Sequence, residues 1–144
     1  MNEVIFHLLY LETTCMSLFT GKILYVLRLQ HGCWYVGSTS NLDRRVYQHR
    51  TGQGSEWTKA HPVIDVAEWV YCQYSEQEDE KTRTLMLKYG IHRVRGGHHC
   101  QVHFTPEYVH RLMGALSHCC SYCGKYGHCD RSCWQRYHNL TRHY

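Results

Sequence analysis

Hydrophobic residues in the first part of the chain follow a strand period and then a helix period. Residues 22–30 are apolar on both faces of an extended segment, which is typical of a central strand. The dipeptide His31-Gly32 is a turn signal, and residues 33–39 predict the returning strand of a hairpin. Ser40 can cap a helix over residues 41–50. The pattern therefore predicts a hairpin that leads directly into an amphipathic helix.

The rest of the chain alternates strand and helix once more before a Cys-rich tail. Residues 63–71 predict a strand, and residues 75–89 predict a helix because acidic residues occupy its first turns. Residues 94–97, VRGG, predict a turn or loop. Thr105 and Pro106 open a last helix, with the threonine as N-cap and the proline at the first helical position. This order predicts an α+β core followed by a C-terminal module.

Two tyrosines of the predicted hairpin set a condition on its loop. Tyr25 and Tyr35 lie on adjacent strands. Because side chains alternate along a strand, the two share a sheet face only if the positions paired across the hairpin sum to an even number. Such a register requires an odd-length loop rather than a two-residue His31-Gly32 turn. We therefore expect an odd loop if the two phenols project over one patch of the sheet.

The predicted helix carries two polar side chains on one flank. Arg45 and His49 are four residues apart and hence neighbours on one face of a helix. Leu42 and Val46 form the adjacent buried stripe, so Arg45 and His49 are expected at its border. A guanidinium in that position can bind a phosphate through two hydrogen bonds while its stem packs. Each residue alone is typical of an ordinary helix face, and their combination with the tyrosines favours a site.

Charge is distributed unevenly along the 144 residues, whose net charge is +4. Residues 1–80 contain 6 Lys or Arg and 10 Asp or Glu, whereas residues 81–144 contain 10 and 2. A basic half indicates a polyanionic partner, nucleic acid first and an anionic membrane second. A merely solvated surface explains the charge alone equally well.

Cysteine and histidine are abundant, with 9 and 13 residues. An odd cysteine count cannot close into a complete set of disulfides. Residues 1–20 have an acidic rather than a basic start, and Glu3, His7 and Glu12 interrupt their apolar run, so they predict neither an export signal nor a membrane span. We therefore expect an intracellular, reducing compartment (cytoplasmic or nuclear), no membrane association, and clustered Cys and His as metal ligands. No function is assigned to residues 1–20.

Four metal-ligating side chains near the C-terminus have the spacing Cys-x2-Cys-x4-His-x4-Cys: Cys120, Cys123, His128 and Cys133. Three thiolates and one imidazole suit a closed tetrahedral Zn²⁺ site, and glycines fall where so tight a loop needs a permissive backbone. The segment resembles the zinc knuckle of retroviral nucleocapsid-type proteins. Because so short a segment cannot bury a core, most of its folding free energy is expected to come from the zinc.

Other cysteines and histidines fit a metal site less well. Cys119 and Cys129 break the knuckle spacing and are therefore left out of the ligand set. The Cys/His group at residues 98–103 is a weaker candidate for a second metal.

Aromatic and basic side chains lie in and beside the predicted zinc loop. Knuckles of this kind bind single-stranded nucleic acid by stacking bases on aromatic rings next to a basic surface. The residues expected to do this are Tyr122, Lys125, Tyr126, Arg131 and Trp134. Packing against the zinc loop explains any one of the aromatic residues about as well.

The first predicted domain resembles the GIY-YIG nucleases. The resemblance rests on ILY at residues 23–25 and YVG at residues 35–37, followed by Arg45 and His49. Two longer stretches, GSEWTKAHPV and EDEKTRTLMLKYGIHRVRGG, look like those of a subgroup, so that the resemblance extends from about residue 22 to residue 97. The first motif lacks its glycine.

This resemblance implies a small three-stranded antiparallel sheet flanked by helices, and it implies hydrolysis of phosphodiester bonds in DNA. Tyr25, Tyr35, Arg45 and His49 would be catalytic. A tyrosine would orient or deprotonate the attacking water, His49 would relay the proton, and Arg45 would neutralise charge at the phosphorus.

The resemblance also implies a divalent metal held by one carboxylate on the later helix. Aligning EDE…VRGG with the subgroup places this ligand at Glu78, with Glu80 in reserve, and the metal would be Mg²⁺ or Mn²⁺. The carboxylates at this helix start are Glu76, Glu78, Asp79 and Glu80, and for most of them complementing the positive end of the helix dipole is a sufficient explanation.

The predicted organisation is an N-terminal extension (1–20), a GIY-YIG nuclease-like domain (21–99), a linker with a helix (100–118), a CCHC zinc knuckle (119–134) and a basic and aromatic tail (135–144). We expect a metal-dependent DNA endonuclease that acts on single-stranded or branched DNA and has no obligate protein partner. The alternative is a non-catalytic nucleic-acid-binding protein on the same scaffold. A protein-binding zinc module is a third class, which predicts no salt-sensitive affinity for nucleic acid.

Overall fold

The computed structural model describes residues 20–140, and the predicted N-terminal extension lies almost entirely outside them. The described strands are β1 Ile23–Leu29, β2 Trp34–Thr39, β3 Val63–Tyr71 and β4 Val94–Gly96. The α-helices are α2 Leu42–Arg50, α3 Glu56–Ala60, α4 Gln77–Tyr89, α5 Pro106–Leu116 and α6 Trp134–Leu140. Short 3-10 turns cover Gln30–Gly32, Ile91–Arg93 and Asp130–Ser132. Within the described part of the chain, no helix is both long and apolar enough to span a membrane.

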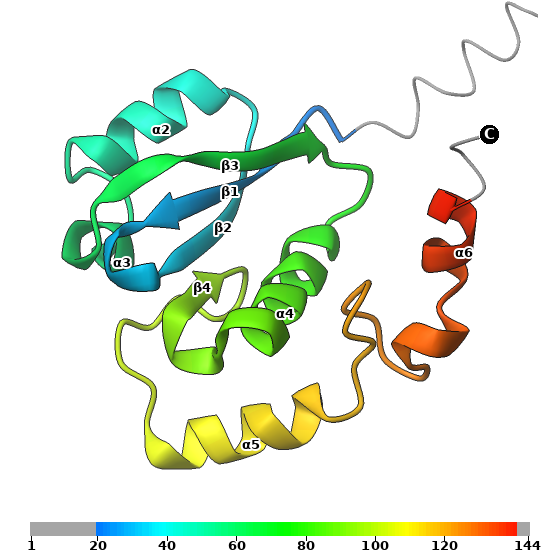
Figure 1. Ribbon diagram of the computed structural model, residues 1–144. Coiled ribbons are helices and arrows are strands. Elements are labelled where there is room, and N and C mark those ends of the chain that lie inside the picture. The colour runs from blue at the N-terminus through cyan, green and yellow to red at the C-terminus, as the bar shows by residue number, and fades with distance from the viewer. Residues whose placement is uncertain (1–19, 141–144) are drawn as a thin grey trace, which may run out of the picture.

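The strands form a four-stranded mixed sheet in the order β3-β1-β2-β4 (Figure 1). Strand β1 is antiparallel to β2 and β3, as expected, while β4 runs parallel to β2. The prediction of three strands, with a turn or loop at residues 94–97, was therefore wrong by one short strand. Three residues are too few to show a strand period. Their pairing depends on the crossover from β3 through α4, which brings the chain back in the parallel direction.

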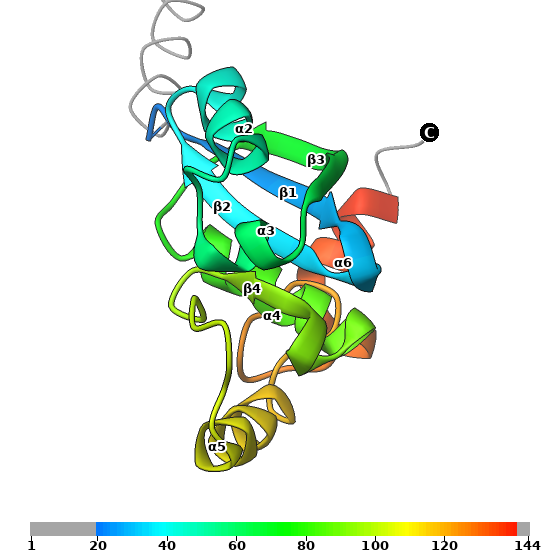
Figure 2. The same cartoon turned by 90° about the vertical axis from the view of Figure 1, so that its left-hand side faces the viewer.

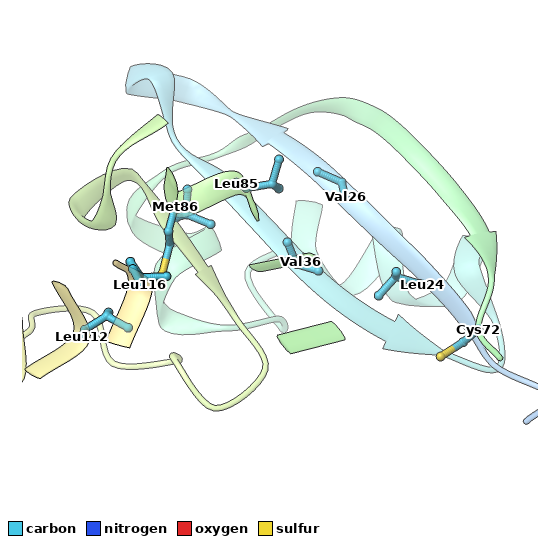
Figure 3. Packing of buried hydrophobic residues seen from close by; sticks show 9 residues of the cluster. Leu24, Val26, Val36, Cys72, Leu85, Met86, Leu112 and Leu116 are labelled. Atoms are coloured by element: carbon cyan, nitrogen blue, oxygen red, sulfur yellow. The ribbon is translucent and has the colours of Figure 1, made fainter. Parts of the chain in front are cut away.

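Helices cover both faces of this sheet, as the α+β prediction requires. Figure 2 shows α2 and α3 on one face, while α4 packs on the other and α5 lies beyond α4. Alternate residues of β1 belong to the two hydrophobic cores, because Tyr25 and Leu27 face α2 whereas Leu24 and Val26 face α4. Figure 3 shows Val26 beside Leu85 of α4 on this second face. The central-strand prediction for β1 is confirmed.

The β1–β2 hairpin has an odd loop. Tyr25 pairs with Gly37 and Leu27 pairs with Tyr35, so the paired positions sum to an even number. The backbone N–H of Leu29 donates to the carbonyl of Cys33 at 2.9 Å, which leaves three residues in the loop. Tyr25 and Tyr35 therefore share the α2 face, as the parity argument required.

Helix boundaries agree with the predictions in most places. Helix α5 begins after Thr105, whose side chain accepts a hydrogen bond from the backbone of Tyr108. Helix α2 is capped by Asn41 rather than by Ser40, because the Asn41 side chain accepts from the backbone N–H of Arg44 at 3.0 Å. Both residue types are good caps, so the sequence did not separate them. The segment 100–118 is more than a spacer, since Leu112 and Leu116 of α5 join the core cluster beside Met86 of α4 (Figure 3).

Arg95 of β4 is buried and links its strand to the segment that follows it. Its guanidinium carbon lies 4.2 Å from the ring centroid of Trp57 and 3.7 Å from that of Phe104. It donates to the carbonyls of Gln101 at 2.5 Å and Val102 at 2.9 Å, and further to those of Ile91 and Val94. Hydrogen bonds to four carbonyls and two aromatic faces offset the cost of burying the charge. This arrangement ties β4 to the segment that leads into α5.

A glycine-to-alanine substitution in the hairpin loop tests the hairpin geometry, and one in α5 serves as its control. Gly32 has φ +68°, where a Cβ atom is strained by roughly 1–2 kcal/mol, so Gly32→Ala should lower the free energy of unfolding by about that amount. Gly114 lies inside α5 with open space at its Cβ position, so Gly114→Ala should raise it by about 0.5–1 kcal/mol. Urea denaturation measures both values. Equal effects of the two substitutions would contradict the three-residue loop.

Candidate active site and metal centre

The Tyr25 phenol lies at the centre of a buried cluster between β1 and α2. Its Oη is 2.9 Å from Nε2 of His49, and Nε of Arg45 donates to the same oxygen at 3.4 Å. The Tyr35 ring lies 6.4 Å from the Tyr25 ring and 4.9 Å from the His49 ring, measured between centroids. The structure thus brings together all four residues predicted from the hairpin and the first helix.

His49 was expected at the border of the buried stripe, but only 2% of it is exposed. The reason is α3, which sequence periodicity did not reveal and which covers the other side of the imidazole. Thr58 of α3 places its Oγ1 2.9 Å from Nδ1 of His49. The border prediction for His49 is therefore wrong, while Arg45 remains half-buried beside it.

The partners of Thr58 define the tautomer of His49. The Thr58 hydroxyl lies 3.0 Å from the carbonyl oxygen of Ser55, which can only accept, and 3.2 Å from Oγ of Ser55, and we assign its single proton to the carbonyl. Nδ1–H of His49 must then donate to Thr58 Oγ1. The neutral imidazole consequently presents an unprotonated Nε2 to the phenol, which donates its proton to it. The arrangement makes His49 the proton acceptor for Tyr25.

Glycines create the space that this cluster occupies. A Cβ atom at Gly37 would lie 2.6 Å from Cζ of Tyr25 and closer still to its hydroxyl, so the phenol rests directly on the glycine backbone. A Cβ atom at Gly54 would lie 2.9 Å from the His49 Cα and would overlap its ring. The YVG motif and the glycine before α3 are therefore required by the positions of Tyr25 and His49.

Burial controls the protonation states in the cluster. Burial, followed by the neighbouring Tyr35, raises the pKa of Tyr25 far above its ordinary value, although Arg45 opposes this shift. Burial and then the positive charge of Arg45 lower the pKa of His49 to about 4. At neutral pH the phenol is therefore protonated and the imidazole is uncharged, as the hydrogen bond between them requires.

Glu78 lies in the first turn of α4, on the side of the tyrosines. Its carboxylate accepts from Oγ of Ser38 in β2 at 2.6 Å and from the backbone N–H of Gly97 at 3.0 Å. Its negative charge contributes, after burial and other neighbours, to the raised pKa values of Tyr25 and Tyr35. Two donors fix this carboxylate and leave further lone pairs free, which suits a divalent cation that keeps most of its waters.

The reserve candidate Glu80 points elsewhere. It accepts from the Tyr74 hydroxyl at 2.6 Å and lies 3.9 Å from the Lys125 ammonium. Of the two carboxylates predicted as metal ligands, only Glu78 joins β2 and the Gly97 loop. The role of Glu78 as a metal ligand stays a prediction.

The C-terminal Cys/His cluster has the geometry of a zinc site. Ligand atoms of Cys120, Cys123, His128 and Cys133 all lie within 4.8 Å of one another. Sγ of Cys123 and Nε2 of His128 are 3.3 Å apart, close to the roughly 3.5 Å that tetrahedral Zn–S and Zn–N bonds imply. Cys119 and Cys129 are not in this group. The cluster is consistent with the predicted zinc knuckle.

The zinc module (residues 119–134) is packed against α4 (Figure 1). The Gly124 backbone lies so close that a Cβ atom there would be 2.1 Å from the Glu80 carbonyl oxygen, and Nε of Arg83 donates to the Gly124 carbonyl at 2.7 Å. Arg83 also lies over the Tyr126 ring at 4.9 Å, and Lys125 lies over Tyr74 at 5.1 Å. The helix that carries Glu78 is therefore held partly by the zinc module.

These contacts divide the five residues expected to bind nucleic acid. Lys125 and Tyr126 contact Glu80 and Arg83 of α4, whereas the alternative explanation had the aromatic residues packing against the zinc loop. Tyr126 is nevertheless 52% exposed. Tyr122 and Trp134 are 43% and 69% exposed, and Arg131 is exposed as well. Their binding to nucleic acid remains a prediction.

The Cys/His group at residues 98–103 is not gathered around a metal. His98 pairs with Asp79 at 2.5 Å, and His99 lies 2.7 Å from the Tyr108 hydroxyl. Within residues 20–140, the Cys/His cluster of the zinc module is the only group of three or more metal-ligating side chains close enough to hold one ion. Sequence proximity alone therefore suggested this second group.

Sequence reasoning missed Ser38 and Thr58. Thr58 lies in the GSEWTKAHPV stretch that supported the family resemblance, so that stretch was the available signal. Ser38 follows the YVG motif directly and had no separate signal.

Comparison with known proteins identifies the class. The GIY-YIG catalytic domain family matches residues 21–86. A UPF0213 protein of Orgyia pseudotsugata multicapsid polyhedrosis virus is 30% identical over 104 residues, which cover 69% of this chain and 95% of the relative. A UPF0213 protein of Halalkalibacterium halodurans is 37% identical over 53 residues, covering 36% of this chain and 56% of the relative. One from Staphylococcus saprophyticus is 26% identical over 68 residues, or 47% and 76% of the two chains. No solved structure is significantly similar.

The protein thus carries a GIY-YIG catalytic domain, a domain of the nuclease superfamily. More particularly, the chain belongs to the UPF0213 family.

The depressed pKa of His49 predicts a loss of stability in mild acid. The unfolded chain binds a proton at this residue near pH 6.5, whereas the folded chain does so only near pH 4. The stabilising contribution is therefore complete above pH 6.5 and is lost as the pH falls from 6.5 towards 4. Between pH 7 and pH 4.5 the free energy of unfolding should fall by about 2–3 kcal/mol through this residue. Urea denaturation of the parent and His49→Gln should differ by this slope, while His92→Gln, at an exposed histidine, should follow the parent.

Zinc content should depend on four ligands and not on the other cysteines of the module. The purified protein should hold about one zinc per chain, Cys133→Ser should lose it, and Cys129→Ser should keep it. Because the Gly124 loop packs on α4, metal loss should also lower the melting temperature of the whole domain. Metal analysis and calorimetry provide the two measurements. Equal zinc retention by both variants would refute the ligand set.

Proposed function

We propose that this protein is a metal-dependent endonuclease that hydrolyses phosphodiester bonds in DNA. The observation that supports it best is the chain of contacts Arg45–Tyr25–His49–Thr58, in which a phenol is held between a guanidinium and a basic imidazole nitrogen. A merely structural tyrosine needs one hydrogen-bond partner. Here the phenol oxygen also faces a half-buried cation, and the charge of an anchored carboxylate, Glu78, acts on the same phenol. Phosphate chemistry requires these kinds of group.

The first step is the activation of water at Tyr25. The phenol oxygen accepts a proton from the attacking water while its own proton passes to Nε2 of His49. The water oxygen forms the new bond to phosphorus as the bond from phosphorus to the 3′ oxygen breaks, and the leaving 3′ oxygen takes a proton from solvent. Burial opposes this transfer in the resting site, because it disfavours both the phenolate and the imidazolium. A bound phosphate supplies negative charge that offsets the effect of Arg45 on His49. Proton transfer by such a positioned side chain contributes typically about 10²–10⁴-fold to the rate.

Arg45 and Glu78 handle the charge that develops at the phosphate. The Arg45 guanidinium has a second hydrogen bond, from Nη1 to Gln48 Oε1 at 3.2 Å, which orients its plane. It can then donate to the phosphate oxygens as negative charge accumulates on them. Glu78 would hold Mg²⁺ or Mn²⁺, and such an ion, when bound, supplies stabilisation of the leaving 3′ oxygen.

The zinc module would target the enzyme to exposed single strands or branched DNA. Tyr122, Trp134 and Arg131 project from it, and bases stack on such aromatic rings without sequence preference. The free thiols among the described residues suit a reducing intracellular compartment.

A nicking assay with matched variants tests the proposal. On supercoiled DNA with Mg²⁺, Arg45→Ala and Glu78→Ala should reduce the nicking rate about 10²–10³-fold, because each removes stabilisation of the transition state. Arg44→Ala and Glu76→Ala are the controls, since these exposed neighbours lie outside the cluster, and both should retain most activity. Omission of Mg²⁺, rather than a chelator, keeps the zinc module intact.

The same assay distinguishes the endonuclease from the non-catalytic nucleic-acid-binding alternative. If the wild type nicks DNA no faster than Arg45→Ala, the enzyme proposal fails. Salt-sensitive DNA binding by that inactive protein would then favour the non-catalytic nucleic-acid-binding function.

A further inference from the structure

A long groove runs along α4 on the face of the sheet opposite Tyr25. Helix α4 covers β2 and β4, and the β3 side of this face stays open. A cavity of about 620 Å³ lies there, and a second of about 180 Å³ continues it towards the N-terminal end of the helix. Both are lined by Glu68, Lys81, Thr84 and Tyr122, so they form one groove, which we call the α4 groove.

The zinc module and the core build this groove jointly. Tyr122 of the module lines one side, and Trp34, stacked on Tyr89 at 4.5 Å between centroids, lies at the far part of the larger cavity. Val26 and Leu85, both buried, contribute apolar surface between them. Aromatic faces separated by an apolar surface are suited to flat, unpaired bases.

The charges of the groove favour a polyanion. Glu68 is paired with Lys81 at 2.6 Å, and Glu80 is held by Tyr74 and Lys125. Lys88, exposed in the last turn of α4, lies over the Tyr89 ring at 5.0 Å instead of facing a carboxylate. The carboxylates are thus compensated within the protein, which leaves the Lys88 ammonium available to a phosphate.

The groove ends at the helix turn that carries Glu78, the proposed metal ligand. Its narrow end is lined by Gln77 and Glu80, the residues that flank Glu78 and Asp79 in the first turn of α4. The 13 residues of α4 span roughly 20 Å, so a strand lying in the groove extends from this turn to Lys88. A volume in the range of about 300–1,000 Å³, typical of ligand sites, admits a few bases but no double helix.

We propose that the α4 groove binds an unpaired DNA strand that continues from the cleavage site, with its bases against Tyr122 and the Trp34–Tyr89 pair and a phosphate at Lys88. The inference rests on the proposed function, because it takes DNA as the substrate. It assigns the preference for single-stranded or branched DNA to a surface that neither the sheet nor the zinc module forms alone.

Two substitutions on the core side of the groove test this. In the Glu78→Gln protein, used so that nothing is cleaved, Thr84→Phe should fill the groove and weaken binding of a labelled oligothymidylate about 5- to 100-fold. Lys88→Ala should reduce the slope of log affinity against log salt by about 0.7. Tyr47→Ala and Lys59→Ala remove an exposed aromatic and an exposed cation from the opposite face, and neither should change these values.

A blunt duplex and a photo-crosslink complete the test. Duplex affinity should not respond to Thr84→Phe, and 5-iodouracil in the oligonucleotide should crosslink to Tyr122 and to Trp34 or Tyr89. Unchanged oligothymidylate binding by both groove variants, equal weakening of duplex binding, or crosslinks confined to residues beyond Tyr122 in the zinc module would each overturn the proposal. Occupancy of the groove by a peptide or by a second copy of the chain would also overturn the proposal. The affinity for the oligonucleotide would then not depend on the groove substitutions.

The outcomes are distinguishable from those of the nicking assay. If the wild type cuts no DNA but Thr84→Phe loses oligothymidylate binding, the α4 groove stands and the hydrolase proposal fails. If the wild type nicks DNA and the groove variants bind the oligonucleotide normally, the hydrolase proposal stands and the α4 groove proposal fails.

Discussion

The hydrogen bond between the Tyr25 phenol and Nε2 of His49 determines how the rest of the site is arranged. It joins the central strand of the sheet to α2 at 2.9 Å in a buried environment. Such a bond requires one protonated and one unprotonated partner, and burial together with Thr58 supplies both conditions. Arg45, on the same helix, is thereby placed at the phenol oxygen. The glycines at positions 37 and 54 are necessary because this bond leaves no room for a Cβ atom on either side.

The zinc module has a second role besides the one its spacing suggests. Its loop packs backbone to backbone against α4, and Arg83 links the two. The free energy of metal binding is largely folding free energy in modules of this size. Part of it therefore stabilises the helix that holds Glu78, and the same contact creates one wall of the α4 groove. Targeting and catalysis would then depend on one structural unit rather than on two domains joined by a linker.

Much of the fold was predictable because its signals are local. The double-faced apolar run of β1, the Thr105 cap and the odd loop implied by Tyr25 and Tyr35 all follow from rules that act over a few residues. The strand β4 and the helix α3 were not predictable in this way. Each is too short for a period, and each forms because a distant element is present: β2 for β4, and the His49 imidazole together with the β2 backbone for α3.

The residue types and their spacing follow from the chain alone. They comprise two tyrosines that could share a face, an arginine and a histidine one turn apart, an acidic helix start, and three cysteines with a histidine. Three features depend on the folded arrangement: His49 is buried and neutral, Glu78 rather than Glu80 is anchored at Ser38 and Gly97, and Lys125 and Tyr126 contact α4. The physical reason is that protonation, orientation and exposure depend on neighbours supplied by other elements. Spacing along one helix or strand cannot specify which neighbour fills the remaining side.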